Sequence, residues 1–517
     1  MGTSRSKQTQ DIGPGELAER RVLVANRGEI ACRILRGIRD EGGIAIAIYS
    51  EADRTAPHVG LADEAYCVGA PPVGESYLNQ ERILEIAKRA RVDLLHPGYG
   101  FFAENGGFAQ AVQDAGITWI GPSPHAIKVM GDKIEARRAV EGSGVAVVPG
   151  SGELPPDPEK AVPHAEKIGY PVLLKAAFGG GGKGMRVAEN RKELIAAVEM
   201  ARREAASAFG NATVYLEKWI RRPRHIEIQL LGDQQGNVVH FGERECSIQR
   251  RHQKLLEECP TPARFPDLRN RMGSAAVEIA QAIGYQSAGT VEFLLDTDGS
   301  FYFLEMNTRL QVEHPVTEMV TGFDLVRRQL RIAIGQPLDV RQEDISWRGA
   351  AIECRINAED AERGFIPSTG RIEGLHLPEG AGVRNDVGFI NGTEVSPHYD
   401  PMMGKLIVWG EDRNTAIARS LRALHEYRIG GVRTNIPFHA WLLSHPRFIA
   451  GEIDTAFLAE EFRPEEMAGG DAETAAVVAA AIAAFRTRPT FKETTSTQTG
   501  SAWKFLGRPG AGGKGWR

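Results

Sequence analysis

The sequence predicts a multidomain protein of mixed α/β and α+β class. At 517 residues the chain is too long for one hydrophobic core, since a domain usually spans ~150 residues. From residue 21 to about 135, short apolar runs alternate with segments of helical periodicity, which is typical of a parallel sheet covered by helices. Beyond that point strand-like segments predominate, so a different architecture follows the first.

The first predicted domain is a doubly wound, Rossmann-like unit. Its opening strand is RVLVAN, and the following helix carries apolar residues at helical spacing, namely Ile30, Ile34, Leu35 and Ile38. IAIAIYS, VDLLHPG and ITWIG supply further strands, while YLNQERILEIAKRA and GFAQAVQDAG supply helices. The regular alternation predicts strands sandwiched between two layers of helices.

Changes in composition and periodicity set the remaining boundaries. We expect six parts: a disordered N-terminal extension (1–20), the doubly wound domain (21–135), a small α/β subdomain suited to form a lid (136–223), a strand-rich subdomain (224–349), a mixed α+β domain (350–462), and an alanine-rich helix with a flexible basic tail (463–517).

Composition excludes several classes of function. The formal net charge of −5 gives no electrostatic reason to bind nucleic acid or an anionic membrane. The longest apolar run, AAVVAAAIAAF, is shorter than the ~20 residues that cross a bilayer. The 5 cysteines form no CxxC pair, which argues against a disulfide framework or a thiolate zinc site. We therefore expect a cytoplasmic protein that acts on a small substrate.

The most unusual local segment is VLLKAAFGGGGKGMR, with four consecutive glycines. Gly179, Gly181 and Gly184 satisfy a formal GxGxxG pattern, but a strand follows where a dinucleotide fold needs a helix. A Walker loop is excluded because Gly184 stands where Ser or Thr would hold magnesium. Two interpretations remain: a flexible hairpin tip, or a glycine turn whose N–H groups approach an anion. The cations Lys175 and Lys183 favour the second, with a polyphosphate as the anion.

A second candidate site combines two carboxylates. In TVEFLLDTDGSFYFLEMN, a four-residue turn at TDGS would pair Asp296 with Phe301 and so place Glu292 opposite Glu305. Like charges at that spacing are destabilising unless a cation lies between them, and Mg²⁺ prefers carboxylate oxygen. The pair therefore predicts a metal site.

Polar residues continue beyond this pair. If the second strand stays extended, one face carries Glu305, Asn307, Arg309, Gln311 and Glu313. A solvated sheet face is the ordinary explanation of charged alternation. Interleaved Asn, Arg and Gln beside a carboxylate pair favour a functional site instead.

Three other features carry little information when taken alone. The basic run QRRHQK is more often a solvated surface than a site. His225 and His252 are each compatible with an ordinary core or surface position. They support a functional site only in combination with the other segments.

Together these segments resemble the biotin carboxylases of the ATP-grasp superfamily, from residue 21 to about 462. The resemblance is carried by VANRGEIACRILR, LLHPGYGFFAEN, GPSPHAIKVMGDK, GGGGKGMR, ECSIQRRHQKLLEE, EMNTRLQVEHPVTE and ECRINAED. It implies a ligase that needs ATP and Mg²⁺ or Mn²⁺. Bicarbonate and ATP would form carboxyphosphate and ADP, after which the carboxyl group would pass to N1 of biotin on a carrier protein.

The resemblance also assigns roles to individual residues. The implied ATP-binding residues are Lys133, Lys175, Gly181, Gly182, Lys183, Glu217, Lys218, Ile220, His225, Gln249, His252, Glu292 and Glu305. The implied metal ligands are Glu292, Glu305 and Asn307. The implied bicarbonate and biotin residues are Lys254, Arg309, Gln311, Val312 and Arg355, and the catalytic set is Lys254, Arg309, Glu313 and Arg355. Glu313 would take the bicarbonate proton, and Arg355 would stabilise the biotin enolate.

The partners follow from what the chain lacks. No biotin-attachment tetrapeptide such as AMKM occurs, and no carboxyltransferase-sized segment follows. We therefore expect one subunit that works with a biotin carboxyl carrier protein and carboxyltransferase subunits. The resemblance implies a homodimer, with Arg33 and Arg384 at interface positions.

The expected context is the first half-reaction of an acetyl-CoA or other acyl-CoA carboxylase. Pyruvate, propionyl-CoA and methylcrotonyl-CoA carboxylases are alternatives. A different ATP-grasp ligase, such as a carboxylate–amine ligase or a carbamoyl phosphate-forming enzyme, is a further hypothesis. A nucleotide-binding scaffold without activity is the last, and it predicts the loss of a metal-binding or base position.

Overall fold

The computed structural model describes residues 15, 17–176, 185–209, 211–466, 478, 480 and 481. The chain divides into two units, Met1–Pro464 and Glu465–Arg517, and almost all described residues belong to the first. Gly181, Gly182 and Lys183, with most of the predicted N-terminal extension and tail, lie outside the described residues. Within the described ranges, every helix falls short of the length and apolar character that a bilayer span requires.

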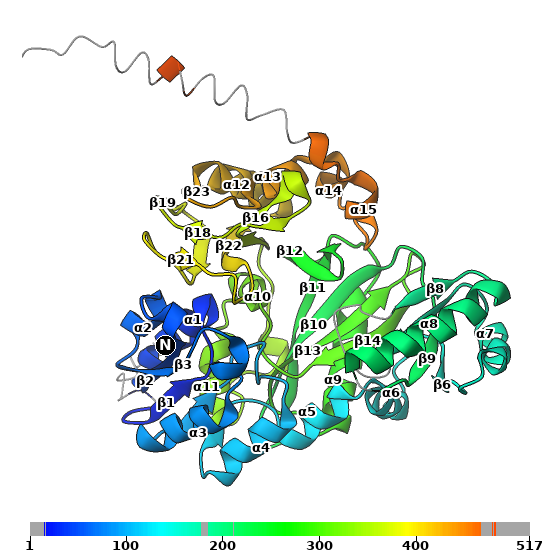
Figure 1. Ribbon diagram of the computed structural model, residues 1–517, viewed down its shortest axis with the longest axis horizontal. Coiled ribbons are helices and arrows are strands. Elements are labelled where there is room, and N and C mark those ends of the chain that lie inside the picture. Colours follow the sequence, from blue (N-terminus) through cyan, green and yellow to red (C-terminus); the bar gives the residue numbers. More distant parts are fainter. Residues whose placement is uncertain are drawn as a thin grey trace, which may run out of the picture. The chain divides into compact units, whose positions relative to one another are not determined.

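The N-terminal domain contains a five-stranded parallel sheet. Its strands are β1 (Arg21–Val24), β2 (Ile44–Ser50), β3 (Glu64–Gly69), β4 (Leu94–His96) and β5 (Thr118–Trp119), and its helices are α1 (Gly28–Asp40), α2 (Pro57–Leu61), α3 (Gln80–Arg89), α4 (Gly106–Asp114) and α5 (Pro124–Gly131). The spatial order is β3-β2-β1-β4-β5, drawn in blue in Figure 1. The predicted doubly wound fold is confirmed.

Both faces of this sheet are buried, which explains its nearly continuous apolar strands. Val22 and Val24 belong to one hydrophobic core, which they share with Ile34 of α1. Leu23 points to the opposite face and belongs to a second core with Phe108 of α4. Successive strand residues face opposite sides, so a strand covered on both sides needs apolar residues at every position.

The next segment forms a four-stranded sheet with the order β6-β9-β7-β8. Its elements are β6 (Gly150–Glu153), β7 (Val172–Ala176), β8 (Arg186–Ala188), β9 (Val214–Lys218), α6 (Lys133–Gly142), α7 (Val162–Ile168) and α8 (Arg191–Phe209). β7 and β8 pair antiparallel on either side of residues 177–184. The two strands predicted to flank the glycines are therefore confirmed.

An eight-stranded sheet makes up the centre of the chain, and each neighbouring pair is antiparallel. Its strands are β10 (Arg224–Gly232), β11 (Val238–Arg250), β12 (Gln253–Cys259), β13 (Ser287–Leu295), β14 (Phe301–Asn307), β15 (Ala350–Asn357), β20 (Val383–Val387) and β22 (Met402–Gly410). Their order is β14-β13-β10-β11-β12-β15-β22-β20. The sheet crosses residue 350 without interruption, because β12 pairs with β15.

Helices and short strands surround this sheet (Figure 1). The helices are α9 (Leu268–Ala282), α10 (His314–Thr321), α11 (Leu325–Ala333), α12 (Arg413–Glu426), α13 (Ile436–Ser444), α14 (Pro446–Ala450) and α15 (Phe457–Glu461). The short strands are β16 (Glu359–Asp360), β17 (Ile366–Pro367), β18 (Gly370–Arg371), β19 (Leu375–His376), β21 (Glu394–Val395) and β23 (Arg428–Ile429). These elements give the mixed α+β character that the sequence predicts.

Candidate active site

The hairpin of β13 and β14 places Glu292 and Glu305 as cross-strand neighbours, as predicted. The predicted turn is wrong, however. The Asp296 N–H donates to the Ser300 carbonyl at 2.8 Å, so the loop is one residue shorter than expected. A one-residue bulge at Leu304 shifts the register again and restores the glutamate pair.

The predicted extended strand is also wrong beyond Asn307, where β14 ends. The following segment turns into α10, and Glu313 occupies the N-cap position of that helix. Gln311 still reaches the carboxylate pair, because its Nε2 donates to Glu292 Oε1 at 2.9 Å. Asn307 Nδ2 donates to the same oxygen at 2.8 Å.

The basic run QRRHQK is the turn between β11 and β12. Arg251 and His252 are exposed and adopt positive φ angles of 51° and 64°, so they form the tip of the hairpin. Gln249 and Lys254 face each other across the ladder. The turn thus places Lys254 on the sheet, where the sequence had indicated only a cluster of cations.

Lys254 lies at the centre of three carboxylates. Its Nζ is 2.6 Å from Glu227, 2.9 Å from Glu292 and 2.7 Å from Glu313. Burial would lower the pKa of Lys254, but the negative charges of Glu227, Glu292 and Glu313 outweigh it and hold that pKa well above its usual range. The ammonium is therefore charged at neutral pH.

Arg355 on β15 reaches Glu313 from the other side. Its Nη2 donates to Glu313 Oε2 at 2.9 Å, and its Nε donates to Glu257 Oε1 at 2.7 Å. Burial would raise the pKa of Glu313, but Lys254 and Arg355 hold it well below its usual range. Glu313 is therefore an ionised carboxylate held between two cations.

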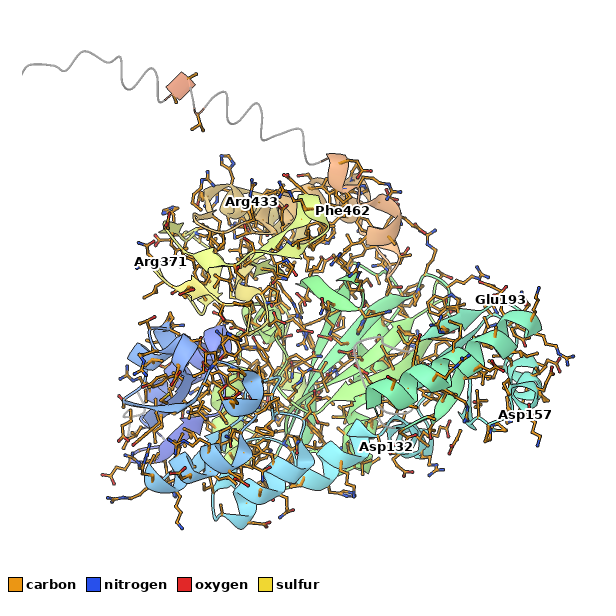
Figure 2. The ribbon with its side chains drawn as sticks, viewed as in Figure 1. Asp132, Asp157, Glu193, Arg371, Arg433 and Phe462 are labelled. Atoms are coloured by element: carbon orange, nitrogen blue, oxygen red, sulfur yellow. The ribbon has the colours of Figure 1, made fainter. Side chains whose placement is uncertain are left out.

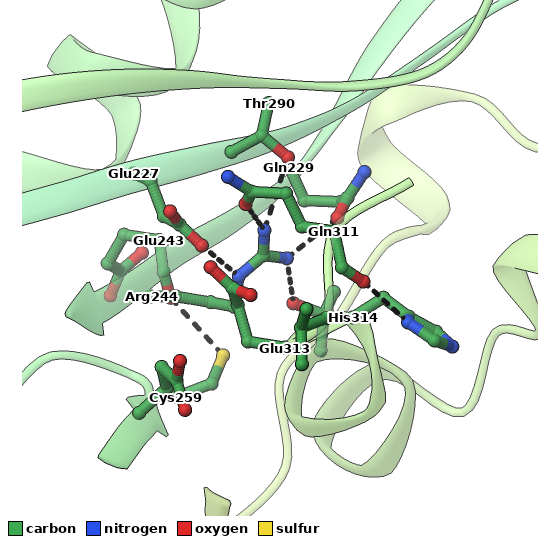
Figure 3. Close-up of polar contacts among 12 residues, drawn as sticks. Glu227, Gln229, Glu243, Arg244, Cys259, Thr290, Gln311, Glu313 and His314 are labelled. Atoms are coloured by element: carbon green, nitrogen blue, oxygen red, sulfur yellow. Dashed lines mark hydrogen bonds and ion pairs between the residues drawn. The ribbon is translucent and has the colours of Figure 1, made fainter. Parts of the chain in front are cut away.

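A fully buried arginine underlies this cluster. Arg244 donates hydrogen bonds to five side chains, which are Glu227 (2.5 Å), Gln229 (2.7 Å), Thr290 (3.2 Å), Gln311 (2.7 Å) and Thr317 (3.0 Å) (Figure 3). It joins the sheet to the segment that carries Gln311 and Glu313. Lys254 and Arg244 share Glu227, so the two cations and their acceptors form one network.

Sequence analysis missed Arg244, Glu227 and Glu257. A signal was present in β10, where Glu227 and Gln229 alternate with apolar Ile226 and Ile228 although the strand is buried on both faces. Buried charges need partners, so such a strand predicts a polar network beside the core. The partners themselves come from distant segments and leave no local pattern.

Three of the predicted nucleotide residues lie on strands of the four-stranded sheet, namely Lys175, Glu217 and Lys218. Lys175 of β7 and Glu217 of β9 share a face, with 2.5 Å between Nζ and Oε2. Lys218 instead donates to the carbonyls of Gly169 and Tyr170, at 2.8 and 3.0 Å, and so stabilises its own subdomain. Ile220 follows β9 and is buried.

Three further predicted nucleotide residues lie between the four-stranded sheet and the carboxylate pair Glu292 and Glu305. They are Lys133, His225 and Gln249. Lys133 begins α6, whose N-cap residue is Asp132 (Figure 2). Burial lowers the pKa of Lys133, while the charge of Glu305 opposes this shift. His225 Nε2 lies 2.8 Å from Glu292 Oε2, and Gln249 Nε2 lies 3.3 Å from His225 Nδ1.

Two predicted residues, Arg309 and Val312, make no direct contact with Lys254. Arg309 donates from Nε to Glu104 at 2.9 Å and from Nη2 to Asn307 at 2.8 Å, so it does not contact Glu313. The Val312 carbonyl accepts from Lys405 Nζ at 2.7 Å. Neither Glu104 nor Lys405 was a predicted site residue.

The carboxylate pair fits a hard divalent cation. Glu292 accepts from several donors, whereas the exposed Glu305 carboxylate accepts no hydrogen bond from the described residues. Solvent reaches the Glu305 side chain, but the surrounding residues remove part of its hydration, and this partial desolvation together with the negative charge of Glu292 raises its pKa. An unpartnered carboxylate oxygen beside a like charge, with an amide oxygen on Asn307, is a donor set that Mg²⁺ or Mn²⁺ prefers.

Arg33 and Arg384 lie apart from this site and pair through one carboxylate. Arg33 donates to Glu318 at 2.9 Å, and Arg384 donates to its other oxygen at 2.7 Å. Burial would raise the pKa of Glu318, but Arg33, His314 and Arg384 lower it to about 2. Both arginines predicted at the interface therefore form ion pairs within the chain.

Three family models match this chain in succession. They are the biotin carboxylase N-terminal domain (residues 18–127), the ATP-binding domain of the carbamoyl-phosphate synthase L chain (132–341) and the biotin carboxylase C-terminal domain (353–460). A pyruvate carboxylase subunit of Methanothermobacter thermautotrophicus is 52% identical over 458 residues, which cover 89% of this chain and 92% of the relative. Biotin carboxylase 1 of Bacillus subtilis is 51% identical over 440 residues, covering 85% and 98%.

Solved structures agree with these relatives. The Campylobacter jejuni biotin carboxylase in its β-γ-ATP complex has a TM-score of 0.83 at 48% sequence identity. The match covers 86% of this chain and 99% of the Campylobacter chain. The biotin carboxylase domain dimer of Hydrogenobacter thermophilus 2-oxoglutarate carboxylase, with MgADP, ADP and bicarbonate, has a TM-score of 0.82 at 49% identity and covers 85% and 97%. Matching domain order, sequence and fold lead to one conclusion: this chain belongs to the biotin carboxylase family.

Proposed function

We propose that this chain carboxylates biotin on a carrier protein, consuming ATP and bicarbonate and releasing ADP and phosphate. The observation that carries the proposal is the convergence of Lys254 and Arg355 on ionised Glu313, beside the carboxylate pair Glu292 and Glu305. A base, two fixed cations and a metal-binding pair are the groups that activation of bicarbonate by ATP requires.

Glu313 would act as the base. Bicarbonate is a poor nucleophile, so its attack on the γ-phosphorus is assisted when its proton passes to a positioned carboxylate. The low pKa of Glu313 makes it ionised but weakly basic. An anion bound between Lys254 and Arg355 would share their positive charge, raise that pKa and so strengthen the base at the moment it is needed.

Arg355 would serve in both half-steps. As bicarbonate oxygen bonds to phosphorus, ADP leaves and carboxyphosphate forms. Its carboxyl group would then pass to biotin N1 while the N1 proton passes to the released phosphate, and negative charge would develop on the biotin ureido oxygen as that proton leaves. A guanidinium that stays charged and is fixed by Glu257 is suited to stabilise that charge. Arg309, Gln311 and the Val312 backbone would complete the anion pocket.

ATP would lie between polar residues of the four-stranded and eight-stranded sheets. Glu292, Glu305 and Asn307 would hold Mg²⁺, which when bound neutralises charge on the nucleotide phosphates. Lys133, Lys175, His225 and Gln249, with Glu217, Lys218, Ile220 and His252, would form the nucleotide pocket. Gly181, Gly182 and Lys183 would close over the phosphates, so we expect Gly181→Val to raise the KM for ATP or lower kcat.

The decisive experiment measures ADP release with and without bicarbonate and free biotin. Turnover should depend on both, and Arg355→Ala should abolish that dependence. A matched control is Arg413→Ala, since Arg413 also pairs with a buried carboxylate, Glu258, at 2.6 Å but does not touch Glu313. Nucleotide turnover that ignores bicarbonate and biotin would exclude this substrate assignment and favour another ATP-grasp ligase.

We also infer a cytoplasmic homodimer that serves a biotin carboxyl carrier protein and carboxyltransferase subunits, in an acyl-CoA carboxylase. The five cysteines are free, which suits a reducing compartment. Acetyl-CoA, propionyl-CoA, methylcrotonyl-CoA and pyruvate can be compared as acceptors once the co-purifying subunits are added. Light scattering at low protein concentration tests the dimer, with Arg384→Glu as the variant expected to weaken it.

A further inference from the structure

We propose that Lys405 is a positioning residue that fixes the active-site segment 309–313 through one backbone carbonyl. The inference deepens the function proposed above and rests on it, since that segment carries the base and the bicarbonate pocket. Lys405 lies on β22 and is fully buried. Its Nζ donates to the Val312 carbonyl oxygen at 2.7 Å.

The segment between β14 and α10 needs such a contact because it lies outside the sheet ladder. Two consecutive carbonyls in it are held by side chains. His314 Nδ1 donates to the Gln311 carbonyl at 2.8 Å, and Lys405 holds the next carbonyl, that of Val312. The Val312 carbonyl and the Glu313 N–H belong to one peptide plane, so fixing the first orients the second.

The charge of Lys405 is balanced from two other parts of the chain. Its Nζ lies 3.3 Å from Glu29 Oε1 on α1 and 4.0 Å from Asp386 Oδ2 on β20. Burying an ammonium is costly, and an apolar side chain of similar volume often stabilises a core equally well. The arrangement is therefore poorly explained by stability alone. It is explained if α1, β20 and β22 together hold one carbonyl in place.

The consequence for catalysis is specific. Glu313 lies 2.7 Å from Lys254 and 2.9 Å from Arg355, and a displacement of about 1 Å would disturb both contacts. The predicted nucleotide-binding residues on β7 and β9 make no contact with the Val312 carbonyl. Loss of the Lys405 contact should therefore impair bicarbonate use much more than ATP binding.

The test uses the full chain with the double variant Lys405→Met/Glu29→Gln, which removes one positive and one negative charge together. The matched control is Arg413→Met/Glu258→Gln, an ion pair between a half-buried arginine of α12 and a buried glutamate of β12 in the same sheet. We expect the Lys405 variant to raise the KM for bicarbonate at least about tenfold while the KM for ATP changes less than about twofold. The amides of residues 310–314 should also exchange hydrogen faster than in the control.

Two results would overturn the proposal. One is an unchanged KM for bicarbonate together with unchanged exchange at residues 310–314. The other is an equal rise of both KM values with faster exchange throughout α1 and β22, which would mean a merely structural role. Hydrogen exchange does not depend on turnover, so it still decides whether Lys405 holds the segment if the wild-type chain shows no bicarbonate dependence and the proposed function fails.

Discussion

The five-stranded and eight-stranded sheets are both buried, but they bury different kinds of side chain. In β1, Val22, Leu23 and Val24 fill cores on both faces. In β10, Ile226 packs in a core while the adjacent Glu227 contacts Arg244 and Lys254. Burial alone therefore does not identify a core. A buried strand that retains charges, each with a partner from another strand, marks a place where the chain accepts an energetic cost for function.

The largest effect should come from removing the proposed base Glu313, which lies at the N-cap of α10 and contacts Lys254 and Arg355 of the eight-stranded sheet. Glu313→Gln keeps the shape of the side chain but cannot accept the bicarbonate proton, so kcat should fall by about 100-fold or more. Steady-state ADP release measures this. Glu243→Gln is the control, because Glu243 is buried on the other face of β11 and pairs with Arg269 at 2.7 Å. An equal fall in kcat in both variants would contradict a special role for Glu313 compared with Glu243.

A core substitution in the parallel sheet domain should act on stability instead. Ile34 is fully buried on α1, and Ile34→Ala should lower the free energy of unfolding by about 2–5 kcal/mol through lost burial and a cavity. Chemical denaturation measures the loss. The kcat per folded molecule should stay at the wild-type value. A fall in kcat comparable to that of Glu313→Gln would contradict the idea that this core contributes to stability rather than to catalysis.

The parallel sheet should also respond to acid through a buried histidine. Burial lowers the pKa of His96 to about 3, whereas a histidine in the unfolded chain titrates near pH 6.5, so only the unfolded state gains the proton as pH falls between these values. Stability contributed by neutral His96 is complete above about pH 6.5 and decreases by about 1.4 kcal/mol per pH unit below it. Denaturation of wild type and His96→Gln at pH 7, 6 and 5 measures the difference. Identical slopes would show that His96 titrates alike in both states.

The smallest of these effects concerns the proposed metal ligand Glu305, on the edge strand β14 of the eight-stranded sheet. Glu305→Gln should raise the Mg²⁺ concentration for half-maximal ADP release about tenfold, equivalent to about 1.4 kcal/mol. Because Glu305 is exposed, the unfolding free energy should change little. Glu85→Gln on α3, also exposed, is the control and should leave the Mg²⁺ dependence unchanged. An unaltered Mg²⁺ titration for Glu305→Gln would remove that residue from the ligand set.

The sequence predicted the apolar sheet better than the polar one. Ile30, Ile34 and Ile38 repeat at the helical period, and that local pattern suffices to predict α1 and the face it buries. Glu292 and Glu305 were paired correctly although the turn was wrong, because the bulge at Leu304 offsets a shorter loop. Neither irregularity has a local signal in the residues around it.

Arg244 shows what local pattern cannot supply. Its acceptors come from β10, β13 and the segment around α10, so they are separated in sequence by up to 73 residues. Its position is determined by sheet order, which periodicity does not specify. Lys405 is similar, since it reaches Val312 across 93 residues of sequence. Motif resemblance named the candidate site residues, but not the buried groups that contact them.

The pairing of β12 with β15 has a consequence for how the chain can be divided. A cut near residue 350 would not release two finished parts, because it would remove the neighbour that satisfies the backbone N–H and C=O groups of β12. The exposed edge would carry Leu256 and its flanking residues as a template for pairing with other molecules. We therefore expect a fragment ending at residue 349 to aggregate through this strand, even though every predicted metal ligand would remain in it.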